Sequence, residues 1–232
     1  MPACFATNKH ETTGRATLAP CKTAPVNDLD MYHHGVDPVT AFVLAGGKSS
    51  RMGRDKAFLE LEGRTLLSLA LEAASTVAAS VWIVGSAAKF AAFAPVVEDV
   101  YPERGPLAGI HAALAATATD LNLIMAVDLP FIQSDFLQYL ISQARESPAV
   151  VVVPKAGGGL QPLCAVYRRH FAEVAERALR AGRNKIDSLF AEVNTRIIEP
   201  EELEQDGFPQ EMFRNLNTEQ DWKAAQIRML PN

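Results

Sequence analysis

From residue 40 onward, short apolar runs alternate along the chain with longer stretches in which apolar residues recur every three or four positions. The short runs are rich in Val, Ile and Leu and are bounded by Gly, Pro or Asp, which is typical of buried strands. They predict strands at 41–45, 81–85, 95–100, 122–130 (as far as Asp128), 149–154, 161–168 and 195–200. The longer periodic stretches predict helices at 64–79, 105–118, 133–146, 170–182, 184–193 and 218–230.

This alternation predicts one three-layer α/β domain over residues 40–232. Strands that are apolar almost throughout indicate a mostly parallel sheet covered by helices on both faces. The glycine-rich segment 155–159 has the composition of a turn, so the two strands that flank it are expected to pair antiparallel and make the sheet mixed. Residues 1–39 are polar and proline-rich and are expected to form a disordered or loosely attached extension, with Met1 and Met31 as candidate starts of translation.

Charge and cysteine usage restrict the class of protein. The chain carries 22 basic and 27 acidic residues, a net charge of −5, which argues against a nucleic-acid partner. No apolar run is long enough for a signal peptide or a membrane span, so no membrane partner is expected. The three cysteines are widely spaced without a C-x-x-C pair, which favours a reducing cytoplasm, and Cys164 in the apolar stretch PLCAVY is expected to be buried.

A glycine-rich, basic loop follows the first predicted strand, with the sequence LAGGKSSRMGRDK from Leu44 to Lys56. Its spacing excludes a Walker A loop, whose first glycine would fall on Phe42, and it excludes the G-x-G-x-x-G dinucleotide fingerprint. Glycines let backbone amides approach an anion closely, and basic side chains donate to phosphate oxygens. Ligands of open α/β sheets bind beyond the carboxyl ends of the strands. Either a phosphate site or a solvated basic loop therefore fits this segment.

A second candidate feature is Asp128, which follows the apolar run 122–127. If this strand is parallel to the first one, Asp128 lies at the same edge of the sheet as the basic loop. A Mg²⁺ site in phosphate chemistry uses one or two carboxylates together with the phosphates themselves. Asp128 is therefore the best candidate metal ligand, the alternative being a structural turn residue before Pro130.

These features lie within a longer similarity. The segment LAGGKSSRMGRDKAFLELEGRTLL resembles the nucleotide-binding signature of the MobA-like nucleotidyltransferases, and among them that of the molybdenum cofactor guanylyltransferases. Further motifs of the family are resembled, in the same order, by EDVYPERGPLAGIHAAL, MAVDLPFI, LQPLCAVYR and NLNTEQDW, so that the similarity spans about residues 40–227. The resemblance implies a three-layer, Rossmann-like nucleotidyltransferase fold with a mostly parallel, mixed central sheet.

The resemblance also implies a reaction. The expected activity is Mg²⁺-dependent transfer of GMP from GTP to the terminal phosphate of molybdopterin or its molybdenum form, which yields the guanine dinucleotide cofactor and pyrophosphate. Attack of one anion on another needs positioning and charge neutralisation more than a protein nucleophile. The implied partners are GTP and molybdopterin as small-molecule substrates and, transiently, other molybdenum-cofactor proteins.

Individual roles follow from the same resemblance. The implied catalytic residues are Arg51 and Lys56, which would neutralise the β- and γ-phosphates, and Asp128, which would hold Mg²⁺. The implied nucleotide-binding residues are Leu44, Ala45, Gly46, Gly47, Lys56, Gly85, Asp99 and Asp128. The implied metal or pterin side consists of Asn215, Asn217 and Arg183, although Arg183 also belongs to a basic helix end that solvent alone would explain.

The base and the acceptor leave alternatives open. Family members commonly carry Asn just after the second strand, whereas this chain has Gly85-Ser86, so Ser86 or a backbone group replaces that amide or base recognition differs. The sequence LAGG at Leu44 favours GTP, because cytidylyl relatives usually read LAAG. The alternatives are cytidylyl transfer to molybdopterin, transfer to a sugar phosphate, and a non-catalytic nucleotide-binding protein.

Overall fold

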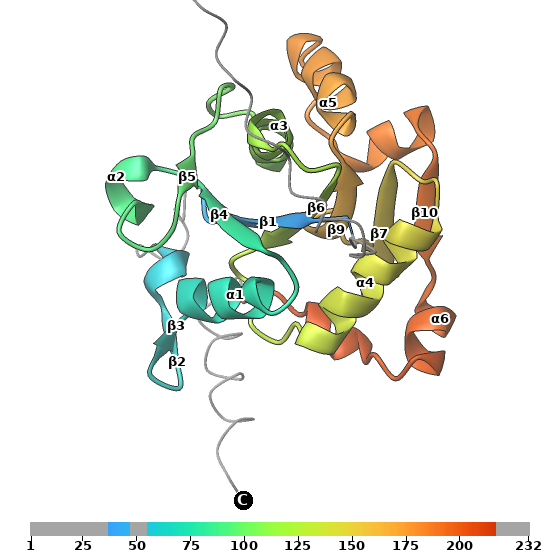
Figure 1. Ribbon diagram of the computed structural model, residues 1–232, viewed down its shortest axis with the longest axis horizontal. Helices are drawn as coiled ribbons and strands as arrows, with labels where there is room; N and C mark the ends of the chain where they lie inside the picture. Colours follow the sequence, from blue (N-terminus) through green and yellow to red (C-terminus); the bar gives the residue numbers. More distant parts are fainter. Residues whose placement is uncertain (1–36, 47–54, 217–232) are drawn as a thin grey trace, which may run out of the picture. The chain divides into compact units, whose positions relative to one another are not determined.

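A twisted β-sheet forms the centre of the computed structural model, which describes residues 37–46 and 55–216 (Figure 1). Within these residues, eight strands join one sheet, with the path β10-β7-β9-β6-β1-β4-β5 and β8 paired to β7. The strands are β1 (Val39–Leu44), β4 (Ser80–Val84), β5 (Val96–Val97), β6 (Leu121–Ala126), β7 (Val151–Ala156), β8 (Gly159–Leu160), β9 (Cys164–Arg168) and β10 (Thr195–Ile198). A separate hairpin consists of β2 (Glu60–Leu61) and β3 (Arg64–Thr65).

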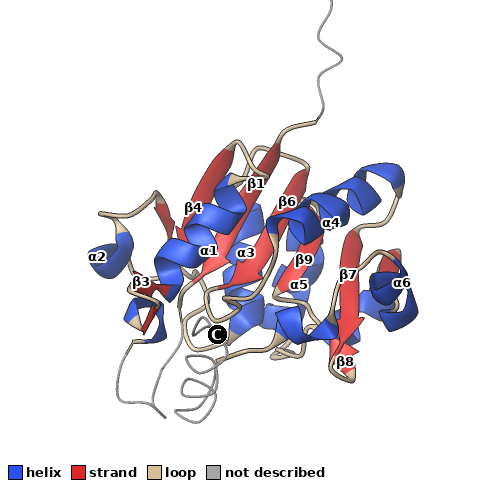
Figure 2. Cartoon of the chain, turned by 90° about the horizontal axis from the view of Figure 1, so that it is seen from below, coloured by secondary structure: helices blue, strands red, loops and turns tan. Residues whose placement is uncertain are grey.

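Helices cover both faces of the sheet, as the three-layer prediction requires. They are α1 (Leu66–Ser75), α2 (Ala87–Phe90), α3 (Pro106–Ala116), α4 (Ser134–Glu146), α5 (Phe171–Arg180) and α6 (Pro200–Gln205), with 3₁₀ turns η1 (Lys56–Phe58), η2 (Asp187–Glu192) and η3 (Gln210–Phe213). In Figure 2, α1 and α4 pass in front of the strands, and α3 and α5 lie behind them.

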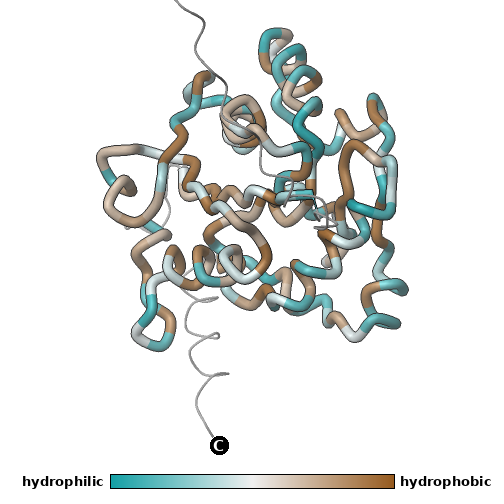
Figure 3. Tube along the Cα trace, viewed as in Figure 1, coloured by the Kyte–Doolittle hydropathy of each residue, from teal (hydrophilic) through white to brown (hydrophobic). Residues whose placement is uncertain are grey.

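Two hydrophobic cores result, one on each face of the sheet. Alternate side chains of β1 point to opposite faces, so that Val43 packs in the core under α1 and α4 while Phe42 packs in the core under α3 and α5. All six residues of β1 and all six of β6 are buried, which explains why both sequences are apolar except for the buried Thr40 and Asn122. Hydrophobic residues accordingly follow the strands in Figure 3, and hydrophilic ones follow the outer turns of α5.

The strand directions confirm a mostly parallel, mixed sheet. β1 is parallel to β4 and to β6, β4 is parallel to β5, and β7 is parallel to β10. β9 is antiparallel to β7, as expected for the strands that flank the turn at 155–159, and it is also antiparallel to its other neighbour, β6. The carboxyl ends of β1, β4 and β6 therefore meet at one edge, where Leu44 is in register with Val84 and Ala126.

Several element boundaries differ from the predictions. The helix predicted from residue 64 begins at Leu66, because the left-handed backbone of Glu62 and Gly63 (φ 54° and 73°) closes the β2–β3 hairpin first. The strand predicted over 95–100 covers only Val96–Val97, and that predicted from 161 begins at Cys164. The predicted helix 218–230 and the proposed extension 1–39, apart from its last three residues, lie outside the described residues. The helices α2 and α6 and the β2–β3 hairpin were not predicted.

The Cys164 thiol is fully buried at the start of β9, as expected. Burial raises its pKa to about 12, because the thiolate would lose its hydration there. A thiol that stays protonated is a poor nucleophile, so Cys164 is a packing residue.

Candidate active site

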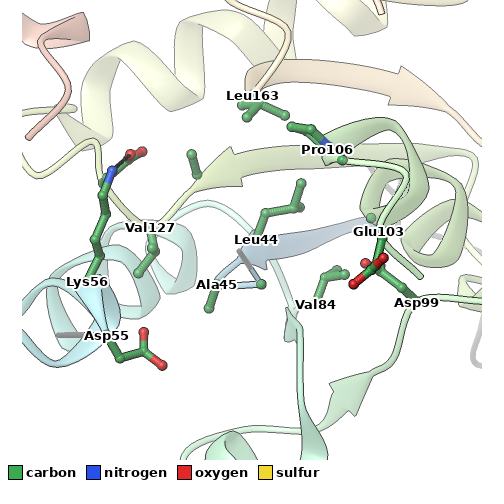
Figure 4. Close-up of a pocket in the computed structure, with 15 residues that line it drawn as sticks. Leu44, Ala45, Asp55, Lys56, Val84, Asp99, Glu103, Pro106, Val127 and Leu163 are labelled. Atoms are coloured by element: carbon green, nitrogen blue, oxygen red, sulfur yellow. Dashed lines mark hydrogen bonds and ion pairs between the residues drawn. The ribbon is translucent and has the colours of Figure 1, made fainter. Parts of the chain in front are cut away.

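A cavity of about 680 Å³ opens at the carboxyl ends of β1, β4 and β6 (Figure 4). Its floor consists of the last residues of these strands, and one wall is the N-terminus of α3. The charged residues that line it are Asp55, Lys56, Asp99, Glu103 and Asp128. The cavity thus lies at the edge of the sheet where the sequence predicts both the basic loop and Asp128.

Lys56 and Asp128 form an ion pair at one end of this cavity. The Lys56 ammonium (Nζ) donates to Oδ2 of Asp128 at 3.2 Å, and the two side chains keep exposed fractions of 23% and 20%. Both are therefore open to a ligand in the cavity. The prediction that Asp128 shares an edge of the sheet with the basic loop is confirmed by this contact.

Local hydrogen bonds fix the backbone on each side of the pair. The Asp55 carboxylate accepts from the Ala57 amide at 3.2 Å and so caps the 3₁₀ turn η1 that carries Lys56. Beyond β6, the Val127 amide donates to the Leu44 carbonyl at 3.1 Å and extends the ladder toward Asp128. The Leu216 amide donates to the Asp128 carbonyl at 3.2 Å, so the chain returns to the site next to Asn215.

The end of β1 forms the centre of the cavity floor. Leu44, Ala45 and Gly46 all line the cavity, and the amides of Ala45 and Gly46 both donate to the Val84 carbonyl, at 3.0 and 3.1 Å. Gly85 lies directly behind them, where a Cβ atom would come within 2.9 Å of Phe90 Cε2 and 3.4 Å of the Gly46 amide nitrogen. This packing explains a glycine at position 85 on steric grounds.

The acidic residues outnumber the basic ones among the described lining residues. Asp99 and Glu103 lie on the side of Leu44 and Val84 away from the Lys56–Asp128 pair (Figure 4). The surrounding protein partly desolvates the Asp99 carboxyl and raises its pKa. The basic residues Lys48, Arg51 and Arg54 lie in 47–54, outside the described residues. Gly46 and Asp55, which flank this segment, both line the cavity.

The predicted site residues fall into three groups. Six of them line the cavity together: Leu44, Ala45, Gly46, Lys56, Asp99 and Asp128. Gly85, Arg183 and Asn215 are described but are not among the lining residues, and the Arg183 guanidinium instead donates to Glu192 at 2.6 Å, beyond the C-terminus of α5. Gly47, Arg51 and Asn217 lie outside the described residues. The assigned roles remain predictions.

Sequence reasoning missed several lining residues. The motif that contains Glu103, Gly105, Pro106 and Gly109 was noted, but none of these residues was singled out. Leu163, which precedes β9, was missed because a strand that begins at the site gives no distinctive sequence signal. Only the folded chain brings 103–109 and Leu163 to the cavity that Lys56 lines.

The residues present can accommodate a divalent cation. Asp128 offers one carboxylate at the cavity surface, and a hard cation in phosphate chemistry takes its remaining oxygens from water and from the substrate phosphates. Over residues 37–46 and 55–216, no three His, Cys, Asp or Glu side chains come together in the way an all-protein metal cage would need. The donor set therefore fits a cation that arrives with its nucleotide. In the same ranges, no helix is long and apolar enough to cross a membrane.

A three-layer α/β sheet with a charged cavity beyond the carboxyl ends of its parallel strands is typical of α/β enzymes that bind a ligand at this edge of the sheet. Residues 41–196 match the family model of the MobA-like NTP transferase domain, and the chain belongs to this family of nucleotidyltransferases.

Individual relatives support this assignment. The chain is 34% identical over 194 residues to the molybdenum cofactor guanylyltransferase of Desulfosudis oleivorans, covering 82% of this chain and 96% of the relative. It is 32% identical over 186 residues to the probable molybdenum cofactor guanylyltransferase of Carboxydothermus hydrogenoformans, covering 80% and 93%. The crystal structure of molybdopterin-guanine dinucleotide biosynthesis protein A from Archaeoglobus fulgidus superposes with a TM-score of 0.73 at 28% identity, covering 82% and 97%.

Proposed function

We propose that this nucleotidyltransferase transfers GMP from Mg²⁺-bound GTP to the terminal phosphate of molybdopterin. A phosphate oxygen of the acceptor attacks the α-phosphorus of GTP, the bond from that phosphorus to the bridging oxygen of the β-phosphate breaks, and pyrophosphate leaves. The products are the guanine dinucleotide form of the cofactor and pyrophosphate. The name shared by the relatives from D. oleivorans and C. hydrogenoformans supports this choice of base and acceptor.

The Lys56–Asp128 pair is the observation that carries the proposal. It joins a cation to a carboxylate at 3.2 Å, on the edge of the sheet where a triphosphate would bind. Asp128 would hold the Mg²⁺ ion, which supplies charge neutralisation on the phosphates when bound. Lys56 places a positive charge where the leaving pyrophosphate accumulates negative charge, and Arg51 is proposed to do the same from residues 47–54.

The other assigned residues complete the proposed site. The backbone of Leu44, Ala45, Gly46 and Gly47 would face the nucleotide, with Asp99 on the far side of the cavity floor. Asn215, Asn217 and Arg183 are proposed on the acceptor side. The reaction is proposed to take place in the cytoplasm, with product passed on through transient contact with other molybdenum-cofactor proteins.

Pyrophosphate release tests this function directly. The full chain is incubated with molybdopterin and Mg²⁺ and with GTP, CTP or ATP in turn, and then with GTP and a sugar phosphate as the acceptor. We expect release only with GTP and molybdopterin, and loss of release when EDTA removes the metal. Release with CTP but not GTP would identify a cytidylyltransferase, and release with the sugar phosphate alone would overturn the acceptor.

A further inference from the structure

The wall of the cavity opposite the Lys56–Asp128 pair is formed by the connection between β5 and α3. Both Asp99 and Glu103 of this connection line the cavity, and both are exposed at its rim. Figure 4 shows their carboxylates beyond Leu44 and Val84, with Lys56 on the other side of the view. A nucleotide whose phosphates lie at Lys56 would therefore extend its base toward Asp99 and Glu103.

Glu103 has an unusual backbone for a residue at such a rim. Its φ of 64° is in the left-handed region, which residues other than glycine adopt rarely and at a cost of roughly 1 kcal/mol or more. In the described ranges, the one other non-glycine residue with positive φ is Glu62, which lies in the β2–β3 turn and does not line the cavity. At Glu103 the strained turn leads directly into Gly105 and the first residues of α3.

The same connection is attached to the body of the protein through Tyr101. Its hydroxyl donates to Oε1 of Glu176 at 3.2 Å and accepts from Nε of Arg180 at 3.4 Å, both on α5. Its ring stands edge-on to the buried His111 ring of α3, with centroids 5.3 Å apart. Tyr101 thus ties the backbone between Asp99 and Glu103 to α3 and α5.

We propose that Glu103 selects guanine by accepting a hydrogen bond from the 2-amino group of the base, next to Asp99. This inference rests on the proposed function. The Watson–Crick edge of guanine carries two adjacent donors, N1–H and the 2-amino group, which suit acceptor-only carboxylates. Cytosine offers one amino donor beside the acceptor N3, whose lone pair two carboxylates would repel. A wall with two acidic side chains therefore discriminates between these bases by charge as well as by fit.

Inosine triphosphate isolates the contact, because it differs from GTP only by lacking the 2-amino group. We expect wild-type protein to prefer GTP over ITP by about tenfold in kcat/KM, as for one hydrogen bond to a charged group at a partly exposed site. Glu103→Gln and Glu103→Ala should lower kcat/KM for GTP toward the ITP value and change kcat/KM for ITP much less. Glu62→Gln, at the other left-handed glutamate, is the matched control and should keep the wild-type ratio.

A second variant tests the support of the wall without touching the nucleotide. Tyr101→Phe keeps the ring against His111 and removes only the hydroxyl bonded to Glu176 and Arg180. Because Tyr101 is a positioning residue, its substitution should raise KM for GTP by a few-fold and lower the GTP/ITP ratio of kcat/KM, while kcat stays unchanged. A loss of kcat with an unaltered GTP/ITP ratio would contradict this role.

The outcomes separate this inference from the proposed function. If wild-type protein turns over GTP but shows no preference for GTP over ITP, or if the Glu103 variants lose GTP and ITP turnover equally, Glu103 does not select guanine. If wild-type protein does not turn over GTP at all, the proposed function fails instead. In that case, calorimetric titration with GTP and ITP still measures whether Glu103→Gln removes a guanine-specific contribution to binding.

Discussion

The ammonium of Lys56 and the carboxylate of Asp128 are 3.2 Å apart, although 72 residues separate them in the chain. Both side chains remain partly exposed, and ion pairs of that kind contribute little to folding stability, typically about 0–1 kcal/mol. The pair is therefore expected to matter more for activity than for the fold. Substitutions at the two positions can test this expectation separately and together.

Asp128→Asn should reduce kcat by about 100-fold or more, because the amide keeps the shape of the side chain but loses the charge needed to hold a divalent cation. The free energy of unfolding should change by less than about 1 kcal/mol. Pyrophosphate release and urea denaturation measure the two effects. Asp120→Asn is a matched control, since Asp120 precedes the opposite end of β6 and pairs with Arg168. Retained turnover in Asp128→Asn would remove Asp128 from the metal site.

Lys56→Met should also lower kcat/KM, by about 100-fold, because the variant loses the ammonium group that stabilises negative charge on the leaving pyrophosphate. Combined with Asp128→Asn, the total loss should be smaller than the product of the two single losses, since residues that act as a unit are not additive. Steady-state kinetics of the four proteins measures this coupling. Lys155→Met is the control, because Lys155 pairs with Glu199 outside the cavity lining. Strictly multiplicative losses would indicate two independent roles.

Gly85→Ala should destabilise the protein by about 1–3 kcal/mol, because the new Cβ would lie 2.9 Å from the Phe90 ring. It should also raise KM for the nucleotide, since Gly46 of the cavity floor lies on the other side of the new atom. Adding Phe90→Leu should recover part of both losses by making room. Gly159→Ala has open space around it and should be nearly neutral. An unchanged urea midpoint in Gly85→Ala would refute the steric account.

His111 predicts a pH dependence of stability. Burial lowers its pKa below the ordinary value near 6.5, Arg180 acts in the same direction, and Glu176 opposes both. The unfolded chain therefore binds this proton more readily, and the folded state loses stability as pH falls below about 6.5 toward the lowered value. The urea concentration at the unfolding midpoint should decrease as pH is lowered from 7.5 to 5.5. The decrease should be smaller in His111→Gln. His170→Gln, at an exposed histidine, should keep the wild-type slope.

The regular elements of the fold could be predicted because burial determines their sequence pattern. β1 and β6 are buried on both faces, so their mainly apolar residues located both strands and, through the parallel pairing, the edge on which Asp128 lies. The β2–β3 hairpin was missed because its turn depends on a left-handed Glu62, a conformation that glutamate does not signal. The predicted strand at 95–100 was too long because it included Val100, which is exposed and is separated from Val96–Val97 by Glu98 and Asp99.

The site was predictable only where its residues follow a strand. Lys56 and Asp128 come from segments that follow predicted strands, Asp99 is implied only by the family resemblance, and all three line the cavity. Glu103 was overlooked because its position depends on the Tyr101 contacts to α5, which lies some 70 residues further along the chain. Long-range contacts of this kind leave no periodic trace in the sequence.

Because β9 runs in the opposite direction to β1, β4 and β6, the two sides of the cavity should tolerate changes in sequence and loop length to different degrees. β1, β4 and β6 end at the cavity, whereas β9 begins there, after the connection that contains β8 and Leu163. A hairpin connection between antiparallel strands can change in length or sequence without moving the strands themselves. Changes in length or sequence should therefore be tolerated first in residues 157–163, while Leu44, Val84 and Ala126 are constrained by the parallel pairing of their strands.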